Sequence, residues 1–138
     1  MTVVAIIQAR MSSSRLPGKV LLPLVEKPVL AHVIERLSYS RLIEKIVVAT
    51  SVDSSDDPIA NFCRENHVLC FRGSLEDVLD RYYRAAIENH ADSVVRITAD
   101  CPVIDPVVVD AVITGFLSGN YDLFGLDGEF PDGLDCTV

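Results

Sequence analysis

The sequence predicts an α/β fold, with a mostly parallel sheet and helices on both of its faces. Short β-branched runs alternate along the chain with amphipathic stretches of about 10–15 residues, which is the pattern of successive βαβ units. The 138 residues are 49% hydrophobic, a length and composition that suit one domain with a substantial core. No internal repeat, low-complexity tract or linker divides the chain, so we expect residues 1–138 to form a single α/β domain.

The chain is expected to open with a strand, a long loop and a helix. Val3–Ile7 is a β-branched apolar run, typical of a buried strand. Residues 10–27 are polar and contain several Ser, Pro and Gly residues, which favour a long loop. Pro28 then suits the first turn of a helix. The apolar stripe of this helix is Leu30, Val33, Ile34 and Leu37.

The middle of the chain repeats the alternation. Ile46–Ala49 and Val68–Phe71 predict the second and third strands. Between them, Asp57 followed by Pro58 is typical of an N-cap with proline at the first helical position.

A further helix is predicted after the third strand. Ser74 is the expected N-cap, with Asp77 three residues later in the manner of a capping box. The apolar stripe predicted for this helix is Leu75, Val78, Leu79, Tyr82, Ala86 and Ile87.

The last part of the chain predicts a fourth strand, a helix and weaker strand signals. Ser93–Thr98 is the strand, and Asp105 followed by Pro106 opens a helix that ends near Gly119. Tyr121–Phe124 is a candidate fifth strand, and Leu134–Val138 is β-prone after a turn-rich loop. Because a natural domain usually pairs such a segment, we expect the 138 residues to be the front part of a longer protein.

The charge distribution excludes some partners. The chain has 12 basic and 20 acidic residues, and no Lys or Arg follows Arg96. Without a basic face, binding to a nucleic-acid backbone or to an anionic membrane surface is disfavoured.

The sequence indicates a cytoplasmic protein. Its N-terminus has no basic region before the apolar run, and no apolar run reaches the roughly 20 residues that span a bilayer. Its cysteines form no C-x-x-C pair, so we expect free thiols in a reducing compartment rather than a zinc site. They are Cys63, Cys70, Cys101 and Cys136.

Chemistry is expected in the loop after the first strand, because ligands of open parallel sheets bind beyond the carboxyl ends of the strands. Residues 8–19 hold three cations, Arg10, Arg15 and Lys19, and a run of three serines. Small residues let backbone amides approach an anion and the cations neutralise its charge, so the loop predicts a polyphosphate as the ligand. The alternative is a solvated basic loop. The loop is not a P-loop, because Ser13 stands where that motif needs glycine and Val20 where it needs Ser or Thr.

The loop after the fourth strand supplies a carboxylate, Asp100. By itself this residue is equally compatible with a turn ahead of the next helix. Facing a polyphosphate loop, however, it is where Mg²⁺ would be held, because that ion prefers one or two carboxylates plus phosphate oxygens. Together the two loops indicate a nucleoside triphosphate and metal-assisted phosphoryl or nucleotidyl transfer.

The motifs also resemble those of a known superfamily. The segment Ile6–Lys19, which reads IIQARMSSSRLPGK, is similar to the signature loop of sugar-activating cytidylyltransferases, including the ketodeoxyoctonate and acylneuraminate enzymes. The nearest resemblance is to the branch named for spore coat polysaccharide biosynthesis. Further matching segments, in the same order, are Ile46–Thr50, Phe71–Ser74 with Glu76–Leu79, Arg96–Pro102 and Phe130–Asp135.

The resemblance implies a Rossmann-like nucleotide-diphospho-sugar transferase fold, CTP and Mg²⁺ as partners, and a sugar acid or related sugar as nucleophile. It implies that Arg10, Arg15 and Lys19 hold the triphosphate and stabilise departing pyrophosphate, and that Asp100 binds the metal. The backbone around Ala9 would meet the cytosine and Arg72 would help shape the base pocket. The nucleotide-binding residues expected on this basis are Ala9, Arg10, Ser13, Ser14, Arg15, Lys19 and Arg72.

The sequence departs from this family in length. The family's enzymes are longer, and a second metal-binding Asp and the usual homodimer contact come from a later segment. Two alternatives to a cytidylyltransferase of surface-polysaccharide synthesis therefore stay open. One is a nucleotide-binding module without catalysis, and the other is an enzyme of the same fold that uses another nucleotide.

Overall fold

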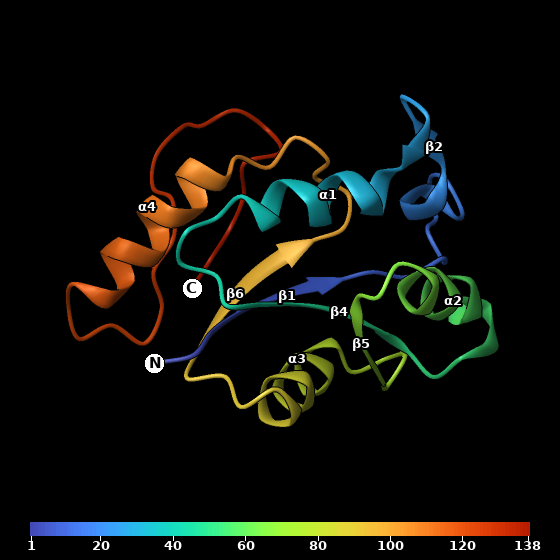
Figure 1. The fold of residues 1–138 in the computed structure, drawn as a ribbon, viewed down its shortest axis with the longest axis horizontal. Coiled ribbons are helices and arrows are strands. Elements are labelled where there is room, and N and C mark those ends of the chain that lie inside the picture. Colours follow the sequence, from blue (N-terminus) through green and yellow to red (C-terminus); the bar gives the residue numbers. More distant parts are fainter.

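A computed structural model describes all residues from 1 to 138 and has one parallel four-stranded sheet at its centre (Figure 1). The strand order is β5-β4-β1-β6, so the first strand lies inside the sheet and the chain adds strands first on one side of it and then on the other. This confirms the predicted α/β class with a parallel sheet. The strands are β1 (Val3–Gln8), β4 (Lys45–Ser51), β5 (Leu69–Gly73) and β6 (Ser93–Thr98).

Helices cover both faces of the sheet, as the alternation predicts. In Figure 1, α1 and α4 lie on one side of the sheet and α3 on the other. None of the helices has the combination of length and apolar character that crossing a membrane requires. They are α1 (Val29–Ser38), α2 (Asp57–Glu65), α3 (Val78–Glu88) and α4 (Pro106–Leu117), with short 3₁₀ turns at η1 (Lys19–Leu21) and η2 (Ser54–Asp56).

The core is divided by the sheet into a large and a small part. Alternate residues of a strand point to opposite faces, so Ala5 and Ile7 of β1 enter the large cluster with α1, α2 and α4. Val4 and Ile6 enter the small cluster, which contains Ala85 of α3. Helix packing is therefore heavier on one face, and α3 alone covers the other.

The long loop predicted over residues 10–27 contains more structure than expected. Besides η1, it holds a two-stranded antiparallel hairpin of β2 (Pro23–Leu24) and β3 (Lys27–Pro28). Val25 and Glu26 between them have φ of 49° and 72°, the left-handed conformation of a tight hairpin turn. The sequence hides this turn because neither residue is one of the usual Gly, Asn or Asp.

The predicted caps of α2 and α3 are each wrong in position. Helix α2 begins at Asp57, so its N-cap is Asp56, although the proline of the first turn is confirmed. Helix α3 begins at Val78, and its N-cap is Asp77, whose side chain accepts from the Asp80 amide. Ser74 accepts from the Asp77 amide instead and closes a turn before the helix. A capping residue occurs at several nearby positions in both segments, and local sequence alone does not choose among them.

The predicted apolar stripe of α3 is also partly wrong. Leu79 is 79% exposed and Ile87 57% exposed, whereas Arg81 and Ala85 are fully buried against the sheet. The hydrocarbon stem of an arginine packs like an apolar side chain while its head forms hydrogen bonds. The inward face is therefore displaced by one residue from the stripe of large apolar residues.

The prediction is confirmed for the start of α4 and is wrong for the segment that follows this helix. Asp105 caps α4 by accepting from the Val107 amide, as predicted. Tyr121–Phe124, however, is not a strand, because only Phe124 finds a backbone partner, exchanging two hydrogen bonds of 2.8 Å with Val138. The Phe124 ring lies so close to Gly115 of α4 that a Cβ there would be 2.4 Å away. Of the β-prone C-terminal segment, Thr137 forms single antiparallel bridges to Arg96 and Gly125.

Candidate functional site

The candidate site lies at the carboxyl edge of the sheet, between the loops that follow β1 and β6. We call these the β1 loop (residues 9–18) and the β6 loop (residues 99–105). From β1 the chain turns to β4 on one side, and it later returns to β6 on the other side. Such a reversal of strand order opens a crevice between the two neighbouring loops, and parallel α/β folds bind ligands there.

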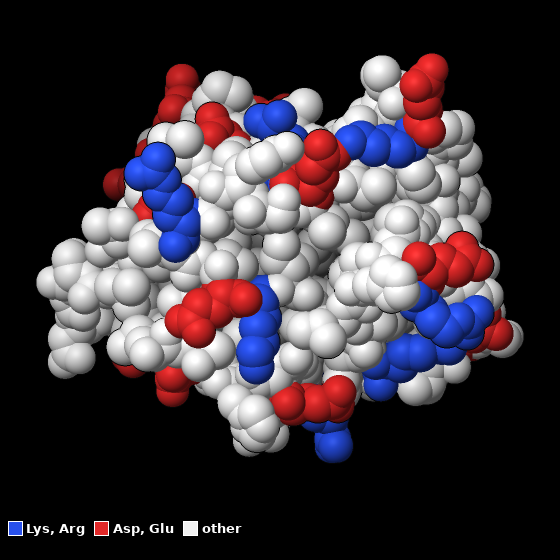
Figure 2. Space-filling view, viewed as in Figure 1, with Lys and Arg blue, Asp and Glu red and all other residues white.

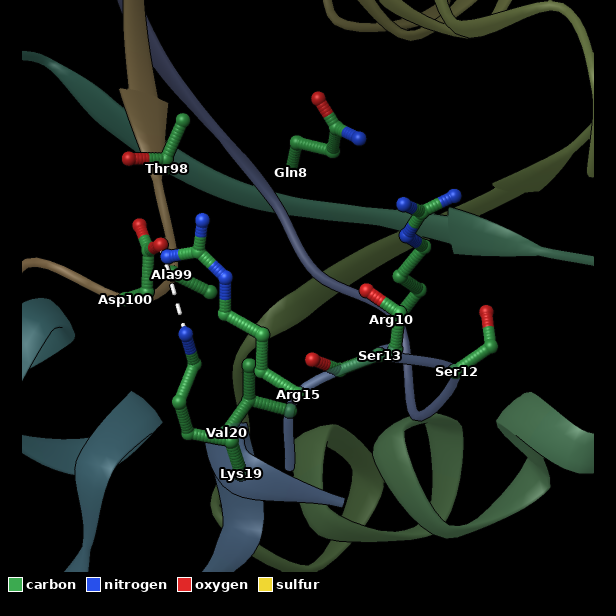
Figure 3. Close-up of a pocket in the computed structure, with 11 residues that line it drawn as sticks. Gln8, Arg10, Ser12, Ser13, Arg15, Lys19, Val20, Thr98, Ala99 and Asp100 are labelled. Atoms are coloured by element: carbon green, nitrogen blue, oxygen red, sulfur yellow. Dashed lines mark ion pairs between the residues drawn. The ribbon is translucent and has the colours of Figure 1, made fainter. Parts of the chain in front are cut away.

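A cavity of about 340 Å³ occupies this crevice. Most of its lining is polar, and it comes from the end of β1, the β1 loop, η1, the end of β6 and the start of the β6 loop. In Figure 3, Arg15, Lys19 and Asp100 lie on one side of the cavity and Arg10 with Ser12 on the other. The lining residues are Gln8, Arg10, Ser12, Ser13, Ser14, Arg15, Lys19, Val20, Thr98, Ala99 and Asp100.

The β1 loop is closed at its base by a backbone contact. The Gly18 amide donates to the Met11 carbonyl over 2.7 Å, so residues 12–17 form a hoop with its two ends joined. Gly18 has φ of +73° and occupies the left-handed region, which suits glycine. A Cβ at this position would also lie 3.3 Å from the Met11 side chain. The hoop presents its serines and Arg15 to the cavity from a closed base.

Lys19 of η1 and Asp100 of the β6 loop form an ion pair on one side of the cavity. Lys19 Nζ lies 3.5 Å from an Asp100 carboxylate oxygen, and the two side chains are 39% and 50% exposed (Figure 3). Burial by itself raises the pKa of Asp100, but the hydrogen bond from Thr98 and the charge of Lys19 outweigh it and hold the pKa below its ordinary value. Asp100 is therefore ionised at neutral pH, so the lining of the cavity holds a cation and an anion side by side.

Most of the residues predicted from the sequence are brought together here. Arg10, Ser13, Ser14, Arg15, Lys19 and Asp100 all line the cavity. Ala9 does not, because its side chain is buried and its amide donates to the Ala49 carbonyl over 3.0 Å.

Arg72 is the other predicted residue outside the cavity, and it lines a separate hollow between β5 and α3. Its guanidinium is occupied by the protein itself. It donates to the carbonyls of Ser51 and Asp53 over 2.8 and 2.9 Å. It also forms an ion pair of 2.8 Å with Asp57. Arg72 thus holds the end of β4 against the start of α2.

Two fully buried charged residues were not predicted from the sequence: Asp56, whose carboxylate contacts the β1 loop, and Arg81 of α3. Asp56 accepts a hydrogen bond from the Met11 amide over 2.7 Å and another from the Ser51 hydroxyl. Burial lowers the pKa of Arg81 while the nearby charge of Asp56 raises it, with a net lowering. The position of Asp56 after a strand was a usable signal, but Asp53 and Asp57 share it and only the fold turns Asp56 inward.

The donors for a metal are limited. Asp100 is the one carboxylate among the residues that line the cavity, and the protein has no cluster of three or more acidic, His or Cys side chains that could hold an ion. Mg²⁺ is commonly held by one or two carboxylates together with the phosphate oxygens of a bound nucleotide. The residues present fit Mg²⁺ in that mode, with the nucleotide supplying the remaining oxygens.

The charged side chains on one face of the molecule are mixed in sign. On the face shown in Figure 2, basic and acidic side chains are interspersed, and no continuous basic surface forms. The cations of the site are confined to the β1 loop and η1.

The family of the chain follows from a comparison with protein-family models. The model described as cytidylyltransferase matches residues 4–127, which include all of the sheet except Val3 and both loops of the site. The chain belongs to the cytidylyltransferase family. The resemblance on which the sequence analysis relied is thereby confirmed.

Solved structures and curated relatives agree with this membership. A cytidylyltransferase from Leptospira borgpetersenii superposes with a TM-score of 0.93 at 37% identity, over 99% of this chain and 59% of that one. The structure of a CMP:2-keto-3-deoxy-manno-octonic acid synthetase complexed with CTP superposes with a TM-score of 0.72 at 30% identity, over 86% of this chain and 48% of that one. The spore coat polysaccharide biosynthesis protein SpsF of Bacillus subtilis is 39% identical over 112 residues, 78% of this chain and 47% of SpsF.

The chain spans about half the length of the curated relatives it matches. The shared half contains the sheet, the cavity and the β1 loop. What the longer proteins bind and make is a property of those proteins, and its extension to this chain is a proposal.

Proposed function

We propose that this protein moves CMP from CTP to the oxygen of a sugar acid or a related sugar. The observation that carries the proposal is the cavity itself, where three cations, three serines and one carboxylate meet at the reversal of strand order. This combination suits a triphosphate with its metal ion. Membership of the cytidylyltransferase family, together with a similar enzyme solved in complex with CTP, supports cytidine as the nucleoside.

The cations have the leading role in this proposal. Arg10, Arg15 and Lys19 hold the three phosphates, and Ser13 and Ser14 add hydroxyl contacts. Arg10 and Arg15 form no ion pair within the protein, and Lys19 pairs only with the half-exposed Asp100. Their charges are therefore free to neutralise the β and γ groups and to stabilise pyrophosphate as it departs.

In this proposal the base meets the backbone around Ala9, whose neighbours Gln8 and Arg10 line the cavity. Arg72 contributes at a distance, because its guanidinium is occupied with Ser51, Asp53 and Asp57. In this role it shapes the base pocket by holding the end of β4 in place.

The metal ion proposed is Mg²⁺, held by Asp100 and by phosphate oxygens. When bound, it offsets the negative charge of the phosphates. For Asp100 to hold it, the carboxylate must exchange its contact with Lys19 for the metal ion, which leaves Lys19 free for the phosphates.

The transfer itself requires little covalent work from the protein. The sugar oxygen attacks the α-phosphorus in line, and the bond from that phosphorus to the oxygen bridging the α and β groups breaks. Pyrophosphate carries away the electron pair of the broken bond. Positioning and electrostatic stabilisation by the β1 loop account for the catalysis.

The wider setting follows from the relatives. A spore coat polysaccharide biosynthesis protein and 3-deoxy-manno-octulosonate cytidylyltransferases are among them. We therefore propose a role in surface-polysaccharide synthesis in the cytoplasm, with a homodimer as a prediction for the longer members of the family.

One observation favours a second function, that of a nucleotide-binding module that turns over sugar poorly. The cavity holds a single carboxylate, so the metal ion has one protein anchor within these residues. Binding of CTP and metal would then survive where transfer does not.

Calorimetry with the four ribonucleoside triphosphates in the presence of Mg²⁺ tests the proposal. We expect CTP to bind more tightly than ATP, GTP and UTP. Equal affinity for all four would remove the cytidine assignment, and a preference for another base would identify an enzyme of the same fold with a different nucleotide. Pyrophosphate release with candidate sugar acids then separates the transferase from the binding module.

A further inference from the structure

Asp56 occupies an N-cap position but does not cap its helix. It precedes α2, yet its side chain forms no capping hydrogen bond with that helix. Its carboxylate instead reaches the Met11 amide over 2.7 Å, across 45 residues of sequence, and also accepts from the Ser51 hydroxyl. This carboxylate is fully buried and does not cap its own helix, so we look for its role in the segments that it contacts.

What Asp56 holds is the base of the hoop in the β1 loop. The Met11 peptide is engaged from two sides, since its amide donates to Asp56 and its carbonyl accepts from Gly18. The Met11 side chain packs against the large core cluster. Residues 12–17, which carry Arg15 and the three serines of the cavity, depend on this base for their position.

The buried charge of Asp56 has an opposite charge near it, that of Arg81. Arg81 is buried nearby, and burial lowers its pKa while the charge of Asp56 acts in the opposite direction. One Arg81 nitrogen donates to the carbonyls of Ser74 and Leu75, while its Nε and second terminal nitrogen have no partner. Because an arginine stays protonated in proteins, Arg81 carries a charge that compensates the buried carboxylate.

We propose that Asp56 is a positioning residue for triphosphate binding: through its hydrogen bond to Met11 it holds the β1 loop in the shape that gathers its serines and cations around the phosphates. The proposal rests on the proposed function for the identity of the ligand. Its structural half, that Asp56 holds the loop, is measurable without any ligand.

The test uses the full chain, hydrogen exchange of backbone amides, and calorimetry with CTP and CMP. In Asp56→Ala we expect the Met11 and Gly18 amides to exchange at least about tenfold faster, while the amides of β1 and β4 stay protected. CTP affinity falls about tenfold, because the loop must now be ordered on binding. CMP affinity falls less, since CMP lacks the β and γ groups that the hoop is proposed to hold.

Two further variants separate positioning from a general effect on the fold. Asp56→Asn keeps an oxygen that accepts from the Met11 amide, and we expect it to restore both the protection of Met11 and the ratio of CTP to CMP affinity. Asp53→Ala is the matched control, because it removes an exposed carboxylate from the same 3₁₀ turn that bonds only the local Ser55 amide. It should leave both measurements as in the unsubstituted chain.

The outcomes that overturn the proposal are distinct from failure of the proposed function. Unchanged Met11 exchange or an unchanged ratio of CTP to CMP affinity in Asp56→Ala would overturn it, as would failure of Asp56→Asn to protect Met11. If Asp56→Ala does not fold because Arg81 is left uncompensated, the double variant Asp56→Ala/Arg81→Met removes both charges and takes its place. If the unsubstituted chain binds no CTP, the proposed function fails, and the exchange of Met11 still decides whether Asp56 holds the loop.

Discussion

Two groups of cations lie at the same edge of the sheet and differ in whether the protein itself occupies their hydrogen-bond donors. Arg10, Arg15 and Lys19 belong to the β1 loop and η1, line the cavity, and are bound by the protein weakly or not at all. Arg72 and Arg81, at the corner of β5 and α3, are engaged with backbone carbonyls of neighbouring segments. A basic side chain at this edge of the sheet can thus bind a ligand if its donors are free, and stabilises the fold if they are already bonded to carbonyls.

The difference shows where ligand-binding capacity comes from. A guanidinium that already donates to carbonyls loses those hydrogen bonds when it turns to a phosphate, so its net gain from binding is small. The cations of the β1 loop lose little of this kind, because their previous partner is water or one exposed carboxylate. Substitutions in the two groups should accordingly affect different quantities, stability in one group and nucleotide affinity in the other.

The largest expected effect is on stability, in the corner of β5 and α3. Arg72→Ala removes two hydrogen bonds to carbonyls and an ion pair from a side chain that is 30% exposed. We expect the free energy of unfolding to fall by about 2–3 kcal/mol. Chemical denaturation measures it, with Arg84→Ala as the control, because Arg84 is 66% exposed and pairs only with Asp80 one helical turn away. The control should lose about 0.5 kcal/mol or less. A stable Arg72→Ala variant that has lost CTP binding would place Arg72 with the ligand-binding group instead.

The next largest effect is on affinity, in the β1 loop. Lys19→Ala should weaken CTP binding by about 2 kcal/mol, because a charge-assisted contact to the β or γ group is lost. CMP binding should change much less, and stability hardly at all, since Lys19 is partly exposed and its one ion pair is with the half-exposed Asp100. Calorimetry with both nucleotides measures the difference. If CMP and CTP lose affinity equally, Lys19 does not lie where the proposal puts it.

Asp100→Asn is expected to act chiefly on the metal dependence of CTP binding. Asparagine keeps the size and turn-forming ability of aspartate but removes the charge that attracts a dication. CTP affinity with Mg²⁺ should fall roughly tenfold, about 1.4 kcal/mol, to the value measured without the ion. Titrations with and without Mg²⁺ check this result. An Asp100→Asn variant that still responds fully to Mg²⁺ would leave Asp100 as a turn residue only.

The smallest effect is a pH dependence of stability. The pKa of Asp100 is held below its ordinary value in the folded protein, so its ionised form stabilises the fold above the unfolded pKa of about 3.9. That contribution is lost as the pH falls through the lower, folded-state pKa. Because both partners are substantially exposed, it amounts to less than about 1 kcal/mol. Denaturation curves of the unsubstituted chain and Asp100→Asn should therefore differ at pH 7 and converge once the pH has fallen below the folded-state pKa of Asp100. Parallel curves at every pH would contradict the pairing with Lys19.

Strong local patterns predicted most of the elements. Ser93–Thr98 matches β6 at both ends, and Asp105 with Pro106 opens α4 as expected. The errors lie where several residues have the same local propensity, as with Ser74 and Asp77 before α3. The false strand at Tyr121–Phe124 has a different cause, because a strand needs a paired neighbour and this segment finds one only at Val138.

The candidate site was predicted to a similar extent. Its cations, Ser13, Ser14 and Asp100 stand beyond the ends of strands, where parallel sheets bind ligands, and all of them line the cavity. Arg72, which lies inside β5 next to its last residue, is absent from the cavity. Asp56 also stands beyond the end of a strand, and nothing in its neighbourhood distinguishes it from Asp53 or Asp57 as the carboxylate that turns inward.

The sequence by itself determined the order of strands and helices, the density of cations after the first strand and the carboxylate after the fourth. These features depend on residue type and spacing within a few positions, because local conformational preference and hydrophobic periodicity act over that range. Only the tertiary structure decided which cations stay free and which carboxylate is buried beneath the β1 loop. Those outcomes depend on hydrogen bonds between distant segments, such as that from Met11 to Asp56 across 45 residues, and no local pattern encodes such a contact.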